Sequence, residues 1–208
     1  MGSKLFPKRV PIIKRLFDLI LAIPGFILIS PVFLILSILV YVKEGRPVFF
    51  KQQRPGLRGE VFKLYKFRTM REPSNDDKLQ SDAERLTKFG RFLRETSLDE
   101  LPEILNVIKG DMSLVGPRPL LLVYLDRYNA EQARRHDVLP GMTGWAQING
   151  RNAISWDEKF KLDVWYVDHW SLWLDVKILW TTIWKVVTRE GINQPGEATM
   201  QEFLGNKQ

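Results

Sequence analysis

An uninterrupted apolar segment near the N-terminus limits how this chain can fold. Residues 19–42 contain no charged side chain, and a run of this length can cross a bilayer as a helix. The run is too long for the apolar part of a signal peptide, and no small-residue cleavage site follows it. Instead, the charged residues within 43–46 lead directly into more chain. We therefore expect residues 1–43 to form a membrane anchor rather than a cleaved signal.

Two features of this anchor favour a path that returns to the side it came from. Pro24 and Pro31 lie inside the run, and each proline removes a backbone donor and kinks a helix. Basic residues also flank both ends, and positive charge favours the cytoplasmic side of a membrane. A helix that enters, bends at Ser30-Pro31 and leaves by the same face satisfies both ends. The Ser30 hydroxyl is then a candidate partner for backbone groups freed at the bend. An ordinary kinked transmembrane span is the alternative.

Composition restricts the partners and the kinds of site. The chain has 31 Lys and Arg against 24 Asp and Glu, a formal net charge of +7. This balance points to anionic partners such as phosphates, acidic lipid head groups or nucleic acid. The sequence has no cysteine and only two histidines, which excludes disulfides and thiolate metal sites and leaves little room for a zinc site. With 208 residues, the chain can bury a substantial core as one domain.

The segment behind the anchor predicts a β-hairpin followed by short helices. Residues 48–52 and 61–68 favour strands, and the turn residues of 55–59 lie between them. Residues 85–94 predict a short helix with four cations on one face, which is either a solvated stripe or a contact for phosphate. These cations are Arg85, Lys88, Arg91 and Arg94. Residues 124–137 predict a polar helix.

The C-terminal third of the chain is rich in tryptophan. All seven tryptophans lie from Trp145 onward, and apolar side chains share one helical face over residues 173–187. Tryptophan favours the boundary between water and lipid, so this helix lies either in the membrane interface or in a tryptophan-rich core. The tail of residues 191–208 is polar and weakly specified.

Asp99 and Glu100 are adjacent carboxylates at the start of an apolar, periodic run. One interpretation is a capping box, with Ser97 as the N-cap and Glu100 at the third helical position. Pro102 disagrees with this register, because proline prefers the first helical position, and a helix from Pro102 would leave both carboxylates before it. In either register, a helix N-terminus is expected to lower both pKa values.

Neighbouring helical side chains point about 100° apart, so two separate roles for Asp99 and Glu100 are more natural than a shared proton. An ionised aspartate can attack phosphorus or hold Mg²⁺, which uses one or two carboxylates plus phosphate oxygens.

Two later segments could contact an anion. Pro117 and Pro119 bracket Arg118 and would hold it on a stiff, extended tip, although the arginine of an ordinary turn is the alternative. Residues 140–152 contain three glycines, whose backbone N–H groups could approach an anion closely. The spacing of these glycines matches neither a P-loop nor a dinucleotide fingerprint.

These motifs together resemble the small monotopic polyprenyl-phosphate phosphoglycosyl transferases, the bacterial sugar-transferase family that starts glycoconjugate assembly. The shared features run from the N-terminal hydrophobic hairpin to about Val187. After the Ser30-Pro31 break come five ordered motifs, which are Lys66-Phe67-Arg68-Thr69-Met70, Ser97-Leu98-Asp99-Glu100-Leu101-Pro102, Gly116-Pro117-Arg118-Pro119, Pro140-Gly141-Met142-Thr143-Gly144 and Asn149-Gly150-Arg151.

The resemblance implies a two-step exchange. Asp99 would attack the β-phosphate of a UDP-sugar and release UMP, and polyprenyl (undecaprenyl) phosphate would then displace Asp99. Glu100 would act as a base or positioning group for the acceptor, and Mg²⁺ beside Asp99 would neutralise the diphosphate. The other implied phosphate or nucleotide contacts are Lys66, Arg94, Pro117, Arg118 and Arg151.

The expected architecture is α+β and mostly helical, with a re-entrant membrane helix hairpin, a small β-hairpin and interfacial amphipathic helices. Residues 44–190 would form the catalytic domain, on the cytoplasmic face of the bacterial inner membrane. We expect a UDP-sugar, polyprenyl phosphate and the bilayer as partners, and no nucleic acid. A non-catalytic membrane adaptor that binds acidic lipids is the alternative, although it would not need an acidic pair in a basic setting. Charge alone suggests a nucleic-acid binder, and the membrane anchor argues against it.

Overall fold

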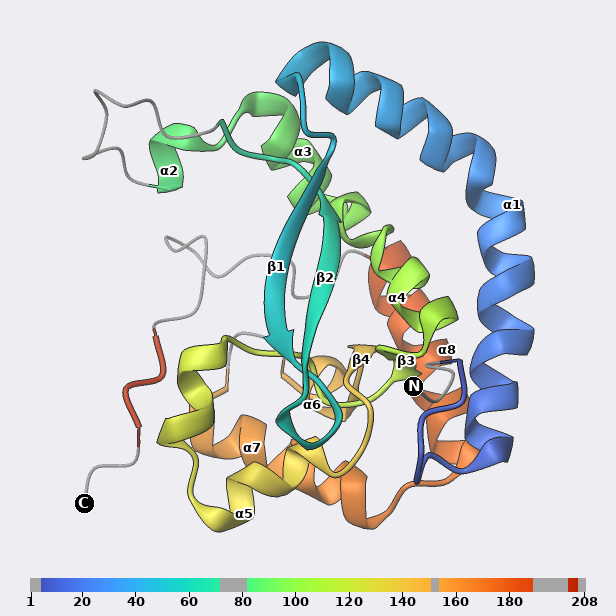
Figure 1. The fold of residues 1–208 in the computed structure, drawn as a ribbon, viewed down its shortest axis with the longest axis vertical. Helices are drawn as coiled ribbons and strands as arrows, with labels where there is room; N and C mark the ends of the chain where they lie inside the picture. The colour runs from blue at the N-terminus through green and yellow to red at the C-terminus, as the bar shows by residue number, and fades with distance from the viewer. Residues whose placement is uncertain (1–4, 72–81, 151–153, 189–201, 206–208) are drawn as a thin grey trace.

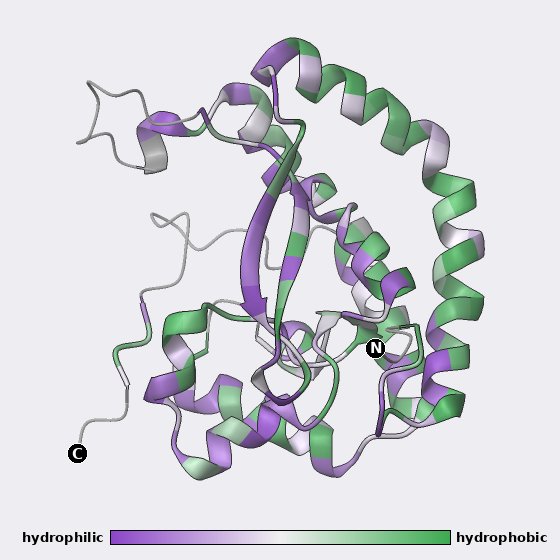
Figure 2. Ribbon diagram, viewed as in Figure 1, coloured by the Kyte–Doolittle hydropathy of each residue, from purple (hydrophilic) through white to green (hydrophobic). Residues whose placement is uncertain are grey.

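One long helix and a compact α+β body make up the part of the chain that the computed structural model describes, residues 5–71, 82–150, 154–188 and 202–205 (Figure 1). The helix, α1 (Ile12–Glu44), has 33 residues and is hydrophobic along most of its length (Figure 2). Many of its large apolar side chains are exposed. Leu28, for example, is 81% exposed. By length and composition, α1 can cross a membrane, and lipid is the solvent that such a surface favours.

α1 runs without interruption through Pro24 and Pro31 and curves around one side of the molecule (Figure 1). Pro31 has no N–H to donate to the carbonyl of Ile27, one turn earlier. The Ser30 hydroxyl donates to that carbonyl instead, at 2.8 Å. This confirms the partner that the sequence suggested. The helix is not divided into two segments, and its re-entrant path stays a prediction.

Both ends of α1 are attached to the same body. Near its start, Lys14 Nζ lies 2.7 Å from a carboxylate oxygen of Asp175 on α8 (Leu172–Thr188). Near its end, Val40 is fully buried in a cluster with side chains of the β-hairpin. In the last turn, Glu44 accepts a hydrogen bond from the Thr87 hydroxyl at 2.6 Å. The helix therefore arches between two fixed points.

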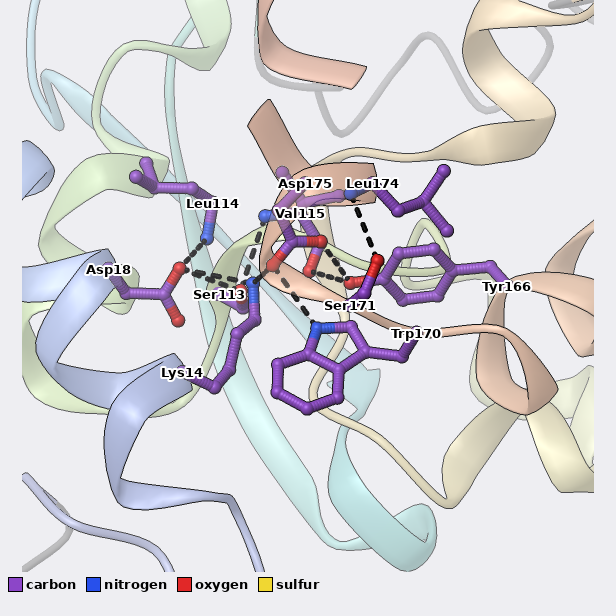
Figure 3. A network of polar contacts seen from close by, with 10 residues as sticks. All are labelled: Lys14, Asp18, Ser113, Leu114, Val115, Tyr166, Trp170, Ser171, Leu174 and Asp175. Atoms are coloured by element: carbon purple, nitrogen blue, oxygen red, sulfur yellow. Dashed lines mark hydrogen bonds and ion pairs between the residues drawn. The ribbon is translucent and has the colours of Figure 1, made fainter. Parts of the chain in front are cut away.

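The attachment at the start of α1 is a buried polar network (Figure 3). Asp18, on the same helix as Lys14, accepts a hydrogen bond from the Ser113 hydroxyl at 2.9 Å. Asp175 accepts from Lys14 and from the Tyr166 hydroxyl, both at 2.7 Å. Asp18 and Asp175 have no exposed surface. These contacts join α1 to α8 and to β3 (Ser113–Val115), the strand that leads into the Arg118 segment.

The predicted β-hairpin is present. β1 (Phe49–Pro55) pairs antiparallel with β2 (Val61–Phe67) through the short turn η1 (Leu57–Gly59), and β1 extends three residues further than predicted. The inward side chains of β2 pack on α4 (Glu103–Lys109), with Phe62, Leu64, Ile104 and Val107 in one core cluster. The parallel pairing of β3 with β4 (Gly141–Thr143) was not predicted.

Two predicted helices are interrupted. Instead of one helix over 85–94, the chain forms α2 (Asp82–Arg85) and α3 (Lys88–Glu95), because the Thr87 side chain accepts from Gly90 N at 2.8 Å and caps a new start. Arg85 is therefore not part of the predicted stripe. The polar segment 124–137 is divided among η3 (Leu122–Arg127), α5 (Ala130–Ala133) and η4 (Arg134–His136).

The remaining helices lie near the C-terminus. α6 (Trp145–Ile148) and α7 (Trp156–Asp168) precede α8, which has the helical conformation predicted for residues 173–187. Trp173, Trp180 and Trp184 of α8 are exposed, which excludes the reading of a buried tryptophan core for this face. The prediction of a weakly specified tail is wrong at Phe203, which is buried in an aromatic cluster with Tyr124, Tyr128, Trp156 and Phe160.

Candidate active site

The acidic pair lies in a tight turn ahead of α4 rather than inside a helix. Ser97 adopts a left-handed conformation (φ 56°) and makes no capping hydrogen bond with its side chain. Leu98–Glu100 form a single 3₁₀ turn (η2), and α4 begins after Pro102. The capping-box interpretation is therefore wrong, and the register with the carboxylates before the helix is correct.

Glu100 is held between two cations from other parts of the chain. Lys66 Nζ, from β2, donates to Glu100 Oε1 at 2.6 Å. Arg118, from the segment after β3, donates Nη1 to Oε2 at 3.2 Å and Nη2 to Oε1. Burial alone would raise the pKa of Glu100, but Arg118 and Lys66 outweigh it and hold that pKa below its ordinary value. Glu100 is thus ionised, and it fixes both cations.

Asp99 has the opposite electrostatic environment. Its side chain is 8% exposed, and burial together with the charge of Glu100 raises its pKa from 3.8 to about 6. The predicted lowering of the pKa is correct in direction for Glu100 and wrong for Asp99, because burial of Asp99 outweighs a helix end that begins only after Pro102. Burial and Glu100 likewise raise the pKa of Glu103 to about 7. Lys66 Nζ lies 3.3 Å from Glu103 Oε1, so one lysine contacts two of these carboxylates.

A cavity of about 300 Å³ opens beside Glu100. Arg94 and Arg118 line the cavity, and Arg94 Nε donates to the Thr69 hydroxyl at 3.1 Å. The Pro117 carbonyl accepts from Gly141 N at 3.0 Å, which ties the Arg118 segment to β4. The structure thus brings together Lys66, Arg94, Asp99, Glu100, Pro117 and Arg118. Arg151, the remaining predicted contact, lies outside the described residues.

Sequence reasoning missed a buried ion pair that supports Arg118. Arg135 Nη2, on η4, donates to the Arg118 carbonyl and to Asp163 Oδ2 on α7, both at 2.7 Å. Arg135 and Asp163 are each 2% exposed. No local pattern distinguishes Arg135 from its neighbour Arg134. Asp163 could have been noticed as one of few charges on the inner face of the helix that begins at Trp156.

The described residues hold no group of three or more His, Cys, Asp or Glu side chains placed to enclose a metal ion. Asp99 is nevertheless a suitable single ligand, because its ionised form is disfavoured by burial and by Glu100, and a cation would relieve both effects. Mg²⁺ binds proteins through one or two carboxylates and completes its shell with water and phosphate oxygens. The donor set therefore fits Mg²⁺ only if a substrate supplies the remaining oxygens.

The chain is similar to known proteins across this whole site. The sequence model of a family described as "Bacterial sugar transferase" matches residues 9–189. The chain is 58% identical over 196 residues to the "Uncharacterized sugar transferase EpsL" of Bacillus subtilis, covering 94% of this chain and 97% of that protein. It is 40% identical over 198 residues to the "Undecaprenyl-phosphate galactose phosphotransferase" of Salmonella typhimurium, covering 86% of this chain and 41% of that protein. It is also 40% identical over 186 residues to the "UDP-glucose:undecaprenyl-phosphate glucose-1-phosphate transferase" of Escherichia coli, covering 84% and 40%. The chain thus spans about two-fifths of the length of the latter two relatives.

Proposed function

This chain belongs to the bacterial sugar transferase family, and we propose that it transfers a sugar phosphate from a UDP-sugar to polyprenyl (undecaprenyl) phosphate, with release of UMP. The names of the Salmonella and Escherichia relatives support this reaction class. The observation that carries the proposal is the buried Asp99 in the electrostatic field of Lys66 and Arg118, next to Glu100, which lines a cavity rich in cations.

The proposed first step uses Asp99 as the nucleophile. A carboxylate oxygen of Asp99 bonds to the β-phosphorus of the donor, and the bond from that phosphorus to the bridging oxygen breaks. UMP leaves with the electron pair, and an aspartyl-phosphosugar remains. A pKa of about 6 leaves Asp99 largely ionised at neutral pH yet more basic than an ordinary aspartate.

In the second step, an oxygen of polyprenyl phosphate attacks the same phosphorus and the Asp99–phosphorus bond breaks, which gives a polyprenyl diphosphosugar. The charge that develops on the transferred phosphoryl oxygens is stabilised by fixed cations, and Lys66 and Arg118 are held for this purpose by Glu100. Mg²⁺, when bound at Asp99, would neutralise part of the diphosphate charge.

The membrane anchor supports this choice of substrates. α1 is continuous with a body that carries the site, so a soluble nucleotide sugar and a lipid phosphate can meet at one interface. We propose that α1 is re-entrant, and that the site faces the cytoplasm at the inner membrane, because basic residues flank both of its ends.

The proposal is tested by UMP release from a panel of UDP-sugars, with the full chain, Mg²⁺ and undecaprenyl phosphate in detergent. The wild type should release UMP from at least one donor, and mass spectrometry should find a phosphosugar adduct on Asp99. Asp99→Asn should release none, whereas Asp137→Asn, at an exposed carboxylate, should be fully active. Wild-type turnover by Asp99→Asn would refute the mechanism. Lipid binding without turnover by any variant would instead support the membrane adaptor.

A further inference from the structure

The cavity beside Glu100 continues to a wall built by α6, α7 and α8. Gln147 on α6, Lys159 on α7 and Lys185 on α8 line this wall. The volume of about 300 Å³ lies at the lower end of the range for small-molecule sites. The proposed reaction has so far given no role to any of these three side chains.

Positive charge exceeds negative charge in the lining of this cavity. Its cations are Arg94, Arg118, Arg135, Lys159 and Lys185, and its carboxylates are Glu100 and Asp163. Both carboxylates already pair with arginines of the same lining. Within the described ranges, neither Arg94 nor Lys185 forms an ion pair, and Lys185 Nζ donates to the Ile148 carbonyl at 2.6 Å. The cavity therefore favours an anionic occupant.

Lys159 interacts electrostatically with Arg118 and Arg135, which line the same cavity. Its ammonium group sits 4.8 Å from the centre of the Trp156 ring, and the side chain is partly buried. Burial lowers the pKa of Lys159 and Asp163 opposes this effect, and with the smaller lowering by Arg118 and Arg135 the pKa is about 8. An anion bound here would offset the repulsion between these cations.

We propose that Lys159 binds the α-phosphate of the UDP-sugar, the phosphate that leaves as UMP. This inference rests on the proposed function. Two phosphates that share a bridging oxygen lie side by side, so a donor whose β-phosphate reaches Asp99 beside Arg118 can place its α-phosphate in the cavity that Arg118 and Lys159 line. When the bridging bond breaks, the electron pair stays on UMP and its phosphate gains one negative charge. The Lys159 ammonium donates a hydrogen bond to this phosphate and stabilises that charge.

The test measures UMP binding to the full chain in detergent by calorimetry. Lys159→Gln should weaken UMP binding about ten- to a hundred-fold, the loss expected for one charge-assisted hydrogen bond. Lys159→Arg should retain most of the affinity because it keeps the charge. Lys161→Gln is the matched control, since Lys161 is on the same helix but is not part of the cavity lining. Uridine, which has no phosphate, should bind equally to the wild type and to Lys159→Gln.

A pH series on the wild type tests the same contact without a risk of misfolding. The groups that face Lys159 are Asp163, Arg118 and Arg135, with Lys185 and Glu100 in the same lining. UMP affinity should fall as the pH rises above about 8, where Lys159 loses its proton in the protein without UMP. UMP keeps two phosphate charges there, because its second phosphate pKa is about 6. Lys159→Arg should remove this dependence.

Three results would overturn the inference. Lys159→Gln could bind UMP as tightly as the wild type, or it could lose uridine affinity to the same extent as UMP affinity. Alternatively, it could raise the KM for polyprenyl phosphate and leave the KM for the UDP-sugar unchanged, which would assign the lysine to the acceptor. If the wild type binds UMP and turns over UDP-sugar in these cases, only this inference fails. If the wild type neither binds nor releases UMP, the proposed function fails with it.

Discussion

Asp99 and Glu100 are neighbours in the chain, but the fold shifts their pKa values in opposite directions. Arg118 and Lys66 keep Glu100 ionised, whereas burial and Glu100 itself raise the pKa of Asp99 to about 6. A carboxylate with a lowered pKa is a weak proton acceptor. The geometry therefore favours Glu100 as the group that positions the cations and Asp99 as the nucleophile. The sequence left open whether Glu100 acts as a base.

Asp99→Asn should make the folded protein more stable at neutral pH. A raised pKa means that the folded state binds the proton more tightly than the unfolded state. The stability that the wild type gains from protonation of Asp99 is therefore complete below about pH 4 and is lost as the pH rises through about 6. Asparagine carries no charge at any of these pH values. The free energy of unfolding of the variant should therefore exceed that of the wild type by up to about 3 kcal/mol at pH 8, and the difference should vanish near pH 4.

Denaturant unfolding in detergent between pH 4 and pH 8 measures this difference. Asp137→Asn, at an exposed carboxylate, should follow the wild type at every pH. A difference between Asp99→Asn and the wild type that does not change with pH would show that the fold does not disfavour the charge of Asp99.

At the scale of the elements, the position of Arg118 depends on two helices that carry no site residue predicted from the sequence. Arg135 on η4 holds the Arg118 carbonyl, and Asp163 on α7 holds Arg135. Tyr128 and Phe160 cover the Arg135 guanidinium at 5.8 Å from each ring centre. The side chain of Arg118 is therefore directed at Glu100 from a backbone that buried contacts keep in place.

Asp163→Asn should destabilise the protein by about 3–5 kcal/mol, because it leaves the buried Arg135 without its counter-charge. The matched control is Asp168→Asn, which removes the exposed pair of Asp168 with Arg134 from the same two elements. That change should leave the stability nearly unchanged, because solvent screens an exposed pair. Chemical unfolding measures both effects. Equal losses of stability in the two variants would show that the buried pair does not support this part of the fold.

Sequence patterns predicted elements where local chemistry dominates. The apolar run, the hairpin turn and the glycine after Lys109 each specify their own structure, and α1, β1–β2 and α4 follow them. The β3–β4 pair was missed because three residues on each strand are too few for a pattern. The break at Thr87 was missed because the spacing of the cations continues across it. The pKa of Asp99 and the Arg135–Asp163 pair depend on burial between distant segments, which no local pattern encodes.

At the scale of the whole molecule, α1 and α8 both expose large apolar side chains. α1 is apolar along its arch, and the nearby α8 exposes Trp173, Trp180 and Trp184, at 77%, 71% and 59%. The Lys14–Asp175 pair joins the two helices, so the tryptophans lie on a helix that contacts the start of α1. Tryptophan prefers the membrane interface, and this arrangement favours a body that rests on the bilayer surface.

The attachments of α1 predict that both of its ends lie on one side of the membrane. A straight helix of 33 residues is about 50 Å long, so length alone permits a full crossing. However, Lys14 binds Asp175 near one end and Glu44 binds Thr87 at the other, and one body cannot lie on both sides of a bilayer.

The chain has no cysteine, so Lys8→Cys and Lys51→Cys each supply a single label site at an exposed position. In intact spheroplasts, a membrane-impermeant maleimide should label neither variant, and after permeabilisation it should label both. Labelling of only one of them in intact spheroplasts would establish a spanning helix and refute the re-entrant anchor.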